Sequence, residues 1–245
     1  MKTLHFLPLF FITILFLGSA GPVRGFDHSN LDAVLKKYVD SKGMVDYAGL
    51  QKNRSELDSY LKSTAAVTEK EFKGWNENEQ LAFLMNVYNA ETLQLIIDHY
   101  PVKTIKKIGP LIGTPWDVKS VELFGDTTTL NKLEHGILRE DYDEPRLHFA
   151  IVCAAMGCPP LRTEAFTAAK LDEQLDDQAR VFLSQANKNR VEGDTLYLSP
   201  IFKWFDGDFE KGGKSVQDYV NPWFKADTSR LKVKYTDYDW DLNKQ

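Results

Sequence analysis

A cysteine at the end of a predicted strand is the first candidate nucleophile in this sequence. Residues 146–152 are largely apolar and compatible with a strand, which leads into Cys153 and then into small residues that end at Cys158. A side chain at such a position projects from a rigid element, and the neighbouring backbone can approach a ligand closely. We therefore predict two alternatives: Cys153 acts as a nucleophile or redox thiol, or it forms a disulfide with Cys158.

A Glu-His pair provides candidate groups for proton transfer. Apolar residues recur at helical spacing over residues 130–139, and Glu134 falls within the apolar arc, with His135 at its edge. A carboxylate that faces the core needs a partner, because desolvation raises its pKa and a nearby cation lowers it. Glu134 is expected either to serve a catalytic site or to form an internal salt bridge, and His135 is a candidate partner for the thiol.

Two asparagines interrupt the apolar sequence of a long predicted helix over residues 79–99. Asn86 and Asn89 are three positions apart, so both amides fall near one face of the helix. Buried amides cost free energy unless they are hydrogen-bonded. We expect them either to hold a loop in place or to orient a polar group such as His135.

The remaining motifs predict neither a metal nor a cofactor. A glycine-rich stretch resembles a phosphate-binding loop, but Asp208 occupies the position of its first glycine and no apolar strand precedes it. Zinc ligand types occur at Cys153, Cys158, His135 and His148. However, the cysteine spacing is loose, and His148 is predicted on the opposite strand face from Cys153.

The first 25 residues have the order of a secretory signal. Lys2 precedes a largely apolar run over residues 6–17, which small residues follow. This run is short for a membrane span, and no second run of comparable strength follows it. We predict a signal peptide over residues 1–25 and a secreted or periplasmic protein without an integral membrane span after its removal. An uncleaved anchor is the alternative.

The elements that must position these groups are mostly helices. The chain has 245 residues, of which 43% are hydrophobic and 27% are charged, and this excludes collagen-like and disordered classes. Short strands are predicted at residues 121–124, 195–198 and 231–235, without regular alternation with helices. We therefore predict an α+β fold: a helix-rich single globular domain over residues 26–245, with a small sheet and a long central apolar helix.

Several ordered segments together resemble the family known as domain of unknown function 547. They are residues 79–90, 133–139, 148–153, 157–161, 198–205 and 237–243, and the resemblance covers about residues 44–243. It identifies the chain as an exported, bacterial-type member of an uncharacterised family, whose pattern includes the Glu-His pair and Cys153. Plant-like members can carry another residue in place of Cys158. The resemblance therefore implies that the fold does not require a disulfide, and it favours a functional thiol.

These features predict an exported thiol-dependent hydrolase or acyl transferase. Cys153 attacks, His135 holds the thiol proton, and Glu134, Asn86 or Asn89 orients the imidazole. The backbone amides of residues 154–157 are candidates for an oxyanion hole, provided that they point to the same side as the thiol. The alternative is a non-catalytic binding or structural module of the cell envelope with a Cys153–Cys158 disulfide. We expect a small-molecule or peptide-like ligand and no nucleic acid, because a formal net charge of −5 offers nucleic acid no bulk electrostatic attraction.

Overall fold

The computed structural model describes residues 25–110 and 112–245. Helices dominate, and the strands form a two-stranded and a three-stranded sheet. The helix-rich α+β prediction is therefore confirmed, with two small sheets in place of one. The predicted signal peptide lies outside the described residues except for Gly25. Within the described ranges, no helix has the length and apolar character needed to cross a membrane.

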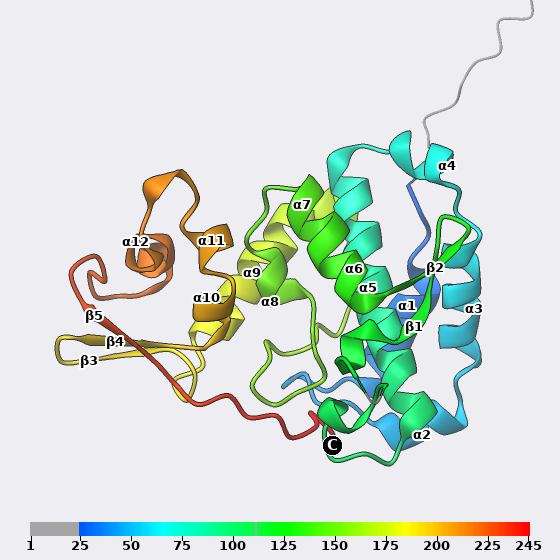
Figure 1. Ribbon diagram of the computed structural model, residues 1–245, viewed down its shortest axis with the longest axis horizontal. Coiled ribbons are helices and arrows are strands. Elements are labelled where there is room, and N and C mark those ends of the chain that lie inside the picture. Colours follow the sequence, from blue (N-terminus) through cyan, green and yellow to red (C-terminus); the bar gives the residue numbers. More distant parts are fainter. Residues whose placement is uncertain (1–24, 111) are drawn as a thin grey trace, which may run out of the picture.

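A long buried helix organises the N-terminal half (Figure 1). The helices here are α1 (Ser29–Tyr38), α2 (Tyr47–Lys52), α3 (Ser55–Ala65), α4 (Glu69–Lys73) and α5 (Glu77–His99). A capping box starts α5, because Asn76 accepts from the N–H of Glu79 and Glu79 accepts from the N–H of Asn76. Every residue from 81 to 93 is buried, including Asn86, Asn89 and Glu91. The helix is thus long and central, but its buried polar residues mean that the prediction of a long apolar helix is not supported.

Short elements connect α5 to the middle of the chain. They are η1 (Ile105–Lys107), η2 (Pro115–Asp117), the antiparallel strands β1 (Lys119–Leu123) and β2 (Asp126–Thr129), α6 (Leu130–Leu133), η3 (Glu134–Leu138) and α7 (Arg139–Asp141). The last three are consecutive, so the helix predicted over residues 130–139 is confirmed. Its middle part, η3, is a π-helical turn. Such turns are rare and occur frequently at functional sites.

The strand predicted over residues 146–152 is wrong. The chain forms the helical turn α8 (Leu147–Ala150), with Ile151 N–H donating to the carbonyl of Leu147 at 3.0 Å. The side chain of Asn89 then bonds the carbonyl of Ala150 and the N–H of Val152, each at 3.0 Å. This amide satisfies backbone groups that a neighbouring strand would otherwise pair. Cys153 therefore follows a helical turn and a buried connection, and does not end a strand.

The C-terminal half has its own core. Its elements are η4 (Ala168–Lys170), α9 (Leu171–Leu183), β3 (Arg190–Glu192), β4 (Thr195–Leu198), α10 (Ile201–Trp204), α11 (Asp206–Phe209), η5 (Lys211–Gly213), α12 (Val216–Val220), η6 (Asn221–Trp223) and β5 (Lys232–Tyr235). β4 pairs antiparallel with β3 and parallel with β5. Strands are confirmed at residues 195–198 and, with one residue less, at residues 231–235. Phe149, Phe202 and Phe209 pack together in the core of this half.

The last residues of the chain connect the two halves. In Figure 1 the segment after β5 runs from the end of the molecule that contains the three-stranded sheet back towards α2. There Val45 N–H donates to the carbonyl of Asn243 at 2.9 Å, and the Tyr47 hydroxyl donates to its side chain at 2.7 Å. This segment is thereby fixed across the boundary between the two cores.

Candidate active site

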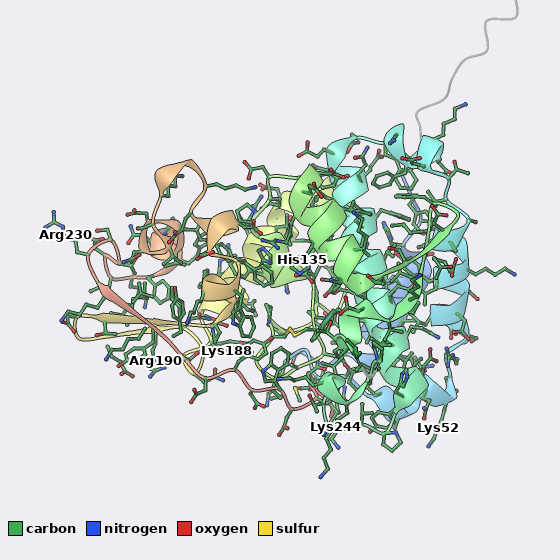
Figure 2. The ribbon with its side chains drawn as sticks, in the orientation of Figure 1. Lys52, His135, Lys188, Arg190, Arg230 and Lys244 are labelled. Atoms are coloured by element: carbon green, nitrogen blue, oxygen red, sulfur yellow. A yellow bond between two sulfur atoms is a disulfide. The ribbon has the colours of Figure 1, made fainter. Side chains whose placement is uncertain are left out.

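A cavity of about 270 Å³ lies at the boundary between the two cores, with walls from both halves. Glu134, His135 and Cys153 all line it. Figure 2 shows His135 near the middle of the molecule, between the helices around α5 and the C-terminal elements. The structure thus brings together three of the five candidate site residues. The other two, Asn86 and Asn89, have a different role.

Glu134 combines deep burial with a hydrogen-bonded side chain. The hydroxyl of Tyr88, on α5, donates to its Oε2 at 2.9 Å. Burial raises the pKa of Glu134 to about 7, against the opposing effects of the Tyr88 hydrogen bond and of Arg139. The carboxyl group therefore changes its protonation state near neutral pH. A general acid or base works best when its pKa lies close to the working pH.

His135 is held by Arg139, one helical turn further along the chain. The guanidinium donates to Nδ1 at 2.5 Å, and the imidazole stacks against Phe205. Because a guanidinium cannot accept a hydrogen bond, Nδ1 is the unprotonated nitrogen and the neutral ring carries its proton on Nε2. Burial, followed by the charge of Arg139, lowers the pKa of His135. This arrangement favours His135 as an N–H donor over His135 as the base for a thiol.

Asp208 anchors the group that holds His135. Its Oδ2 accepts from Nε of Arg139 at 2.6 Å and from Nε2 of His148 at 2.7 Å. Burial tends to raise the pKa of Asp208, but the hydrogen bonds from His148 and Arg139 outweigh burial and hold the pKa well below its usual range. Burial also lowers the pKa of His148, so its neutral ring donates to Asp208. Sequence reasoning missed this role of Asp208, for which no local signal exists.

Replacing Asp208 with Asn is expected to destabilise the protein by about 2–3 kcal/mol at pH 7, because Arg139 loses its charged partner. The pKa of Asp208 is depressed in the folded state, so its contribution is complete above the ordinary carboxyl range and decreases as the pH falls below about 4. Urea denaturation of the wild-type and Asp208→Asn proteins, at pH 7 and at acidic pH, measures the difference in their free energies of unfolding. Asp206→Asn, an exposed change on the same helix, is the control. An equal loss in both variants would contradict this role of Asp208.

Cys153 and Cys158 form a disulfide, and both residues line the cavity. The hydroxyl of Tyr238 lies 3.0 Å from the Sγ of Cys153 and must be the donor, because a disulfide sulfur carries no proton. The Cys153 N–H donates to the Sγ of Cys158 at 2.9 Å. Burial and the nearby Glu134 raise the pKa of Tyr238, so its hydroxyl stays protonated. Each sulfur thus accepts a hydrogen bond of the kind that stabilises a thiolate.

The predicted oxyanion hole at residues 154–157 is wrong for the two amides nearest Cys158. Met156 N–H donates to the carbonyl of Asp241 at 2.8 Å, and Gly157 N–H donates to that of Asp239 at 2.7 Å. A Cβ atom at Gly157 would lie 2.8 Å from the Tyr238 ring, so only glycine fits there. Ala154 has a positive φ of 56°, which is costly for a residue with a Cβ atom. This turn fixes the C-terminal segment. Among the side chains that line the cavity, His135 is a candidate donor for an oxyanion.

The two candidate asparagines hold buried backbone in place. Asn89 bonds residues 150 and 152 as described above, and Asn86 makes the same double contact with the N–H and carbonyl of Phe166, at 3.0 and 2.8 Å. Neither residue lines the cavity. These contacts match the first of the two roles expected for the asparagines, in which their amides hold a loop in place. Asn89 still matters to the site, because it fixes the connection that ends at Cys153.

Asn89→Leu is expected to destabilise the fold by about 2–4 kcal/mol, since the carbonyl of Ala150 and the N–H of Val152 lose buried partners. Thermal or urea unfolding measures the change. Asn78→Leu, an exposed position at the start of α5, is the matched control, and we expect it to change stability by less than about 0.5 kcal/mol. If Asn89→Leu were as stable as the control, the two hydrogen bonds of Asn89 would not contribute to the stability of the fold.

The cavity also contains the four residues considered for zinc. Cys153, Cys158, His135 and His148 line it together, because the helical turn α8 brings His148 to the side that the strand prediction excluded. Nevertheless, across residues 25–110 and 112–245, no cluster of three or more His, Cys, Asp or Glu side chains could hold a metal ion. His148 is instead bonded to Asp208.

Comparison with known proteins matches one family to the central part of the chain. The model of the family described as "Protein of unknown function, DUF547" matches residues 72–183. The chain is a member of the DUF547 family. The matched segment includes all five candidate site residues and Arg139, whereas Asp208 and Tyr238 lie beyond it. No curated protein and no solved structure matches the chain.

Proposed function

We propose that this DUF547 protein is an exported, thiol-dependent hydrolase or acyl transferase that acts when its Cys153–Cys158 disulfide is reduced. The observation that supports this proposal is the presence of Cys153 in the same cavity as Glu134 and His135. A secreted or periplasmic location fits the disulfide, since oxidising compartments maintain such bonds. The disulfide form protects Cys153. A dithiol reductant supplies the two electrons and two protons that open the bond, and the reduced form presents the Cys153 thiol to substrate.

Each site residue has its own role in the proposed reaction. The proton of the Cys153 thiol passes to the Glu134 carboxylate, with the Tyr238 hydroxyl bonded to the sulfur. The thiolate attacks an acyl carbonyl carbon, and the oxyanion accepts a hydrogen bond from Nε2–H of His135. When the intermediate collapses, the bond to the leaving group breaks and Glu134 returns the proton to that group. Water or another acceptor then loses a proton to Glu134, attacks the thioester and releases the Cys153 thiolate, which regains the proton.

Acylation of the wild-type protein tests this proposal. The fully oxidised and the fully reduced protein are incubated with p-nitrophenyl acetate, and intact mass and peptide mapping locate the acetyl group. We expect one acetyl group on Cys153 of the reduced protein and none on the oxidised protein. A folded, fully reduced protein whose Cys153 remains unacetylated would refute the proposal. Equal acetylation of Cys153 and Cys158 would also refute it, since the site would not distinguish them.

The disulfide supports a second candidate, a non-catalytic binding or structural module of the envelope. In that case the bridge serves the fold, and the cavity binds a small-molecule or peptide-like ligand without chemistry. Thiol counting distinguishes the two functions. A disulfide that withstands mild reductant until the protein unfolds favours the module, and a folded protein with two free thiols favours the enzyme.

A further inference from the structure

Four of the aromatic residues that line the cavity contact one another, and we call them the aromatic rim. They are Trp116, Trp204, Tyr238 and Trp240. Tyr238 lies between two tryptophans, with ring centroids 4.8 Å from Trp204 and 4.5 Å from Trp240. Trp116 approaches Trp240 from another wall, at 6.1 Å. Trp204 is 47% exposed. A large apolar side chain left open beside a cavity is typical of a surface that a ligand covers.

The rim is fixed before any ligand binds. Tyr238 and Trp240 lie on the C-terminal segment, on the half-buried side of an alternating pattern whose other side exposes Asp237, Asp239 and Asp241. The backbone carbonyls of residues 239 and 241 accept hydrogen bonds from the turn that follows Cys153. Such preorganised rings lose little conformational entropy on binding. The same turn therefore joins the rim to the disulfide.

The polar groups of the lining carry almost no charge. Among the described residues that line it, none is Lys or Arg, and the only carboxyl group is that of Glu134, which has a pKa of about 7. Thr114, Asn131 and His135 add hydroxyl, amide and imidazole groups. Ionic ligands need an opposite charge in the site. Thr114 and Asn131 are exposed and each donates to Asp117, but the Thr114 hydroxyl can still accept a hydrogen bond, and Asn131 keeps a second amide hydrogen and its side-chain carbonyl for a ligand. A neutral ligand with both an apolar ring face and several hydroxyl groups satisfies the whole lining.

The outer aromatic surface is already in contact with a cation of the protein itself. The Nζ atom of Lys106 lies 4.4 Å from the Trp240 ring centroid. Trp204 and Trp240 are nearly parallel, at an angle of 23° and 5.9 Å apart, so they leave no slot between them for a cationic group. The rim is therefore a platform for stacking and not a cage for an ammonium ion.

We propose that the aromatic rim binds the ring of a neutral saccharide. If the proposed function above also holds, the acyl group that Cys153 accepts is then an ester on that saccharide. One apolar face of a sugar ring stacks on the exposed ring of Trp204, which Trp240 supports, and the hydroxyl groups of the sugar bond to Thr114 and Asn131. An O-acyl group then extends inward to the Cys153 sulfur. The cavity is smaller than those that hold drug-sized ligands, which suits a single ring with its acyl group.

Binding to the oxidised protein tests this inference without acyl transfer, because Cys153 is blocked. Wild-type protein is titrated with cellotriose, maltotriose and chitotriose, and binding is followed by tryptophan fluorescence and saturation-transfer NMR. We expect saturable binding of at least one trisaccharide. Trp204→Ala and Trp240→Ala should each weaken it about tenfold. Tyr235→Ala is the control, since Tyr235 is 39% exposed on β5 but does not line the cavity.

Three outcomes would overturn the inference. They are the absence of saturable binding of every trisaccharide up to millimolar concentrations, equal affinity in Trp204→Ala, and binding of tetramethylammonium in place of any saccharide. Saccharide binding without acetylation of reduced Cys153 would leave this inference intact and refute the proposed enzyme. Acetylation of reduced Cys153 without saccharide binding would refute this inference and leave the proposed enzyme intact.

Discussion

Cys153→Ser is expected to abolish acyl-enzyme formation, whereas Cys158→Ser should form it without any reductant. Removing Cys158 leaves Cys153 as a free thiol next to the Tyr238 hydroxyl, and removing Cys153 takes away the nucleophile of the proposed reaction. Loss of a catalytic nucleophile lowers rates by about 10³-fold or more. The initial burst of p-nitrophenol release, with intact mass to count acetyl groups, measures both variants.

The two variants are matched controls for each other, because both lack the disulfide. Each should lose about 2–3 kcal/mol of stability, so a difference in acylation between them cannot come from stability. Urea unfolding verifies that the losses are equal. A folded Cys158→Ser protein with an alkylatable but unacetylated Cys153 would contradict the proposed chemistry. So would acetylation of Cys158 in the Cys153→Ser protein at the rate expected for Cys153.

The residues of the candidate site were predictable where local pattern determines burial. Helical spacing predicts that Glu134 lies among apolar residues, and the structure confirms its burial. The same pattern places His135 at the edge, where it lines the cavity. The role of Cys153 is suggested by its residue type alone and stays a prediction. The burial of Glu134 and the edge position of His135 were predictable because each depends on a few neighbouring positions.

The partners that determine the chemistry of the site were not predictable from the sequence. Arg139 and Asp208 are 69 positions apart, and Cys153 and Tyr238 are 85 positions apart, so no periodicity connects them. Without Arg139, the imidazole of His135 would be free to act as a base. With it, the ring is held as an N–H donor. Long-range contacts therefore change the expected role of a residue whose position was correctly predicted.

The wrong strand prediction has the same origin. Residues 146–152 have the composition of a buried strand, but composition reports burial more directly than backbone conformation. Asn89 satisfies the backbone groups of Ala150 and Val152 from a neighbouring helix. A single long-range amide thus permits an irregular connection where local propensity indicates a strand. That connection brings His148 and Cys153 to the same cavity.

Glu134→Gln is expected to lower the rate of acyl transfer by about 10²–10⁴-fold and to remove its dependence on a group with a pKa of about 7. The carboxylate must be ionised to accept the thiol proton, so the wild-type rate rises as the pH increases through about 7. Glutamine retains the oxygen that accepts from Tyr88, which keeps the local packing. Rates of p-nitrophenyl acetate turnover between pH 5 and 9, measured on reduced protein, test this expectation.

Stability has the opposite dependence on pH, which separates catalysis from folding. The pKa of Glu134 is raised from 4.5 to about 7 in the folded state, so stability decreases as the pH rises through this range. Glutamine does not ionise, so the variant does not lose stability in this way. Glu134→Gln should therefore be more stable than wild type at pH 8 by up to about 3 kcal/mol.

Glu91 is the matched control, because burial raises its pKa to about 8 and it does not line the cavity. Glu91→Gln should also gain stability at alkaline pH while it retains the wild-type rate. Equal rate losses in both variants would mean that Glu134 affects activity only through the fold.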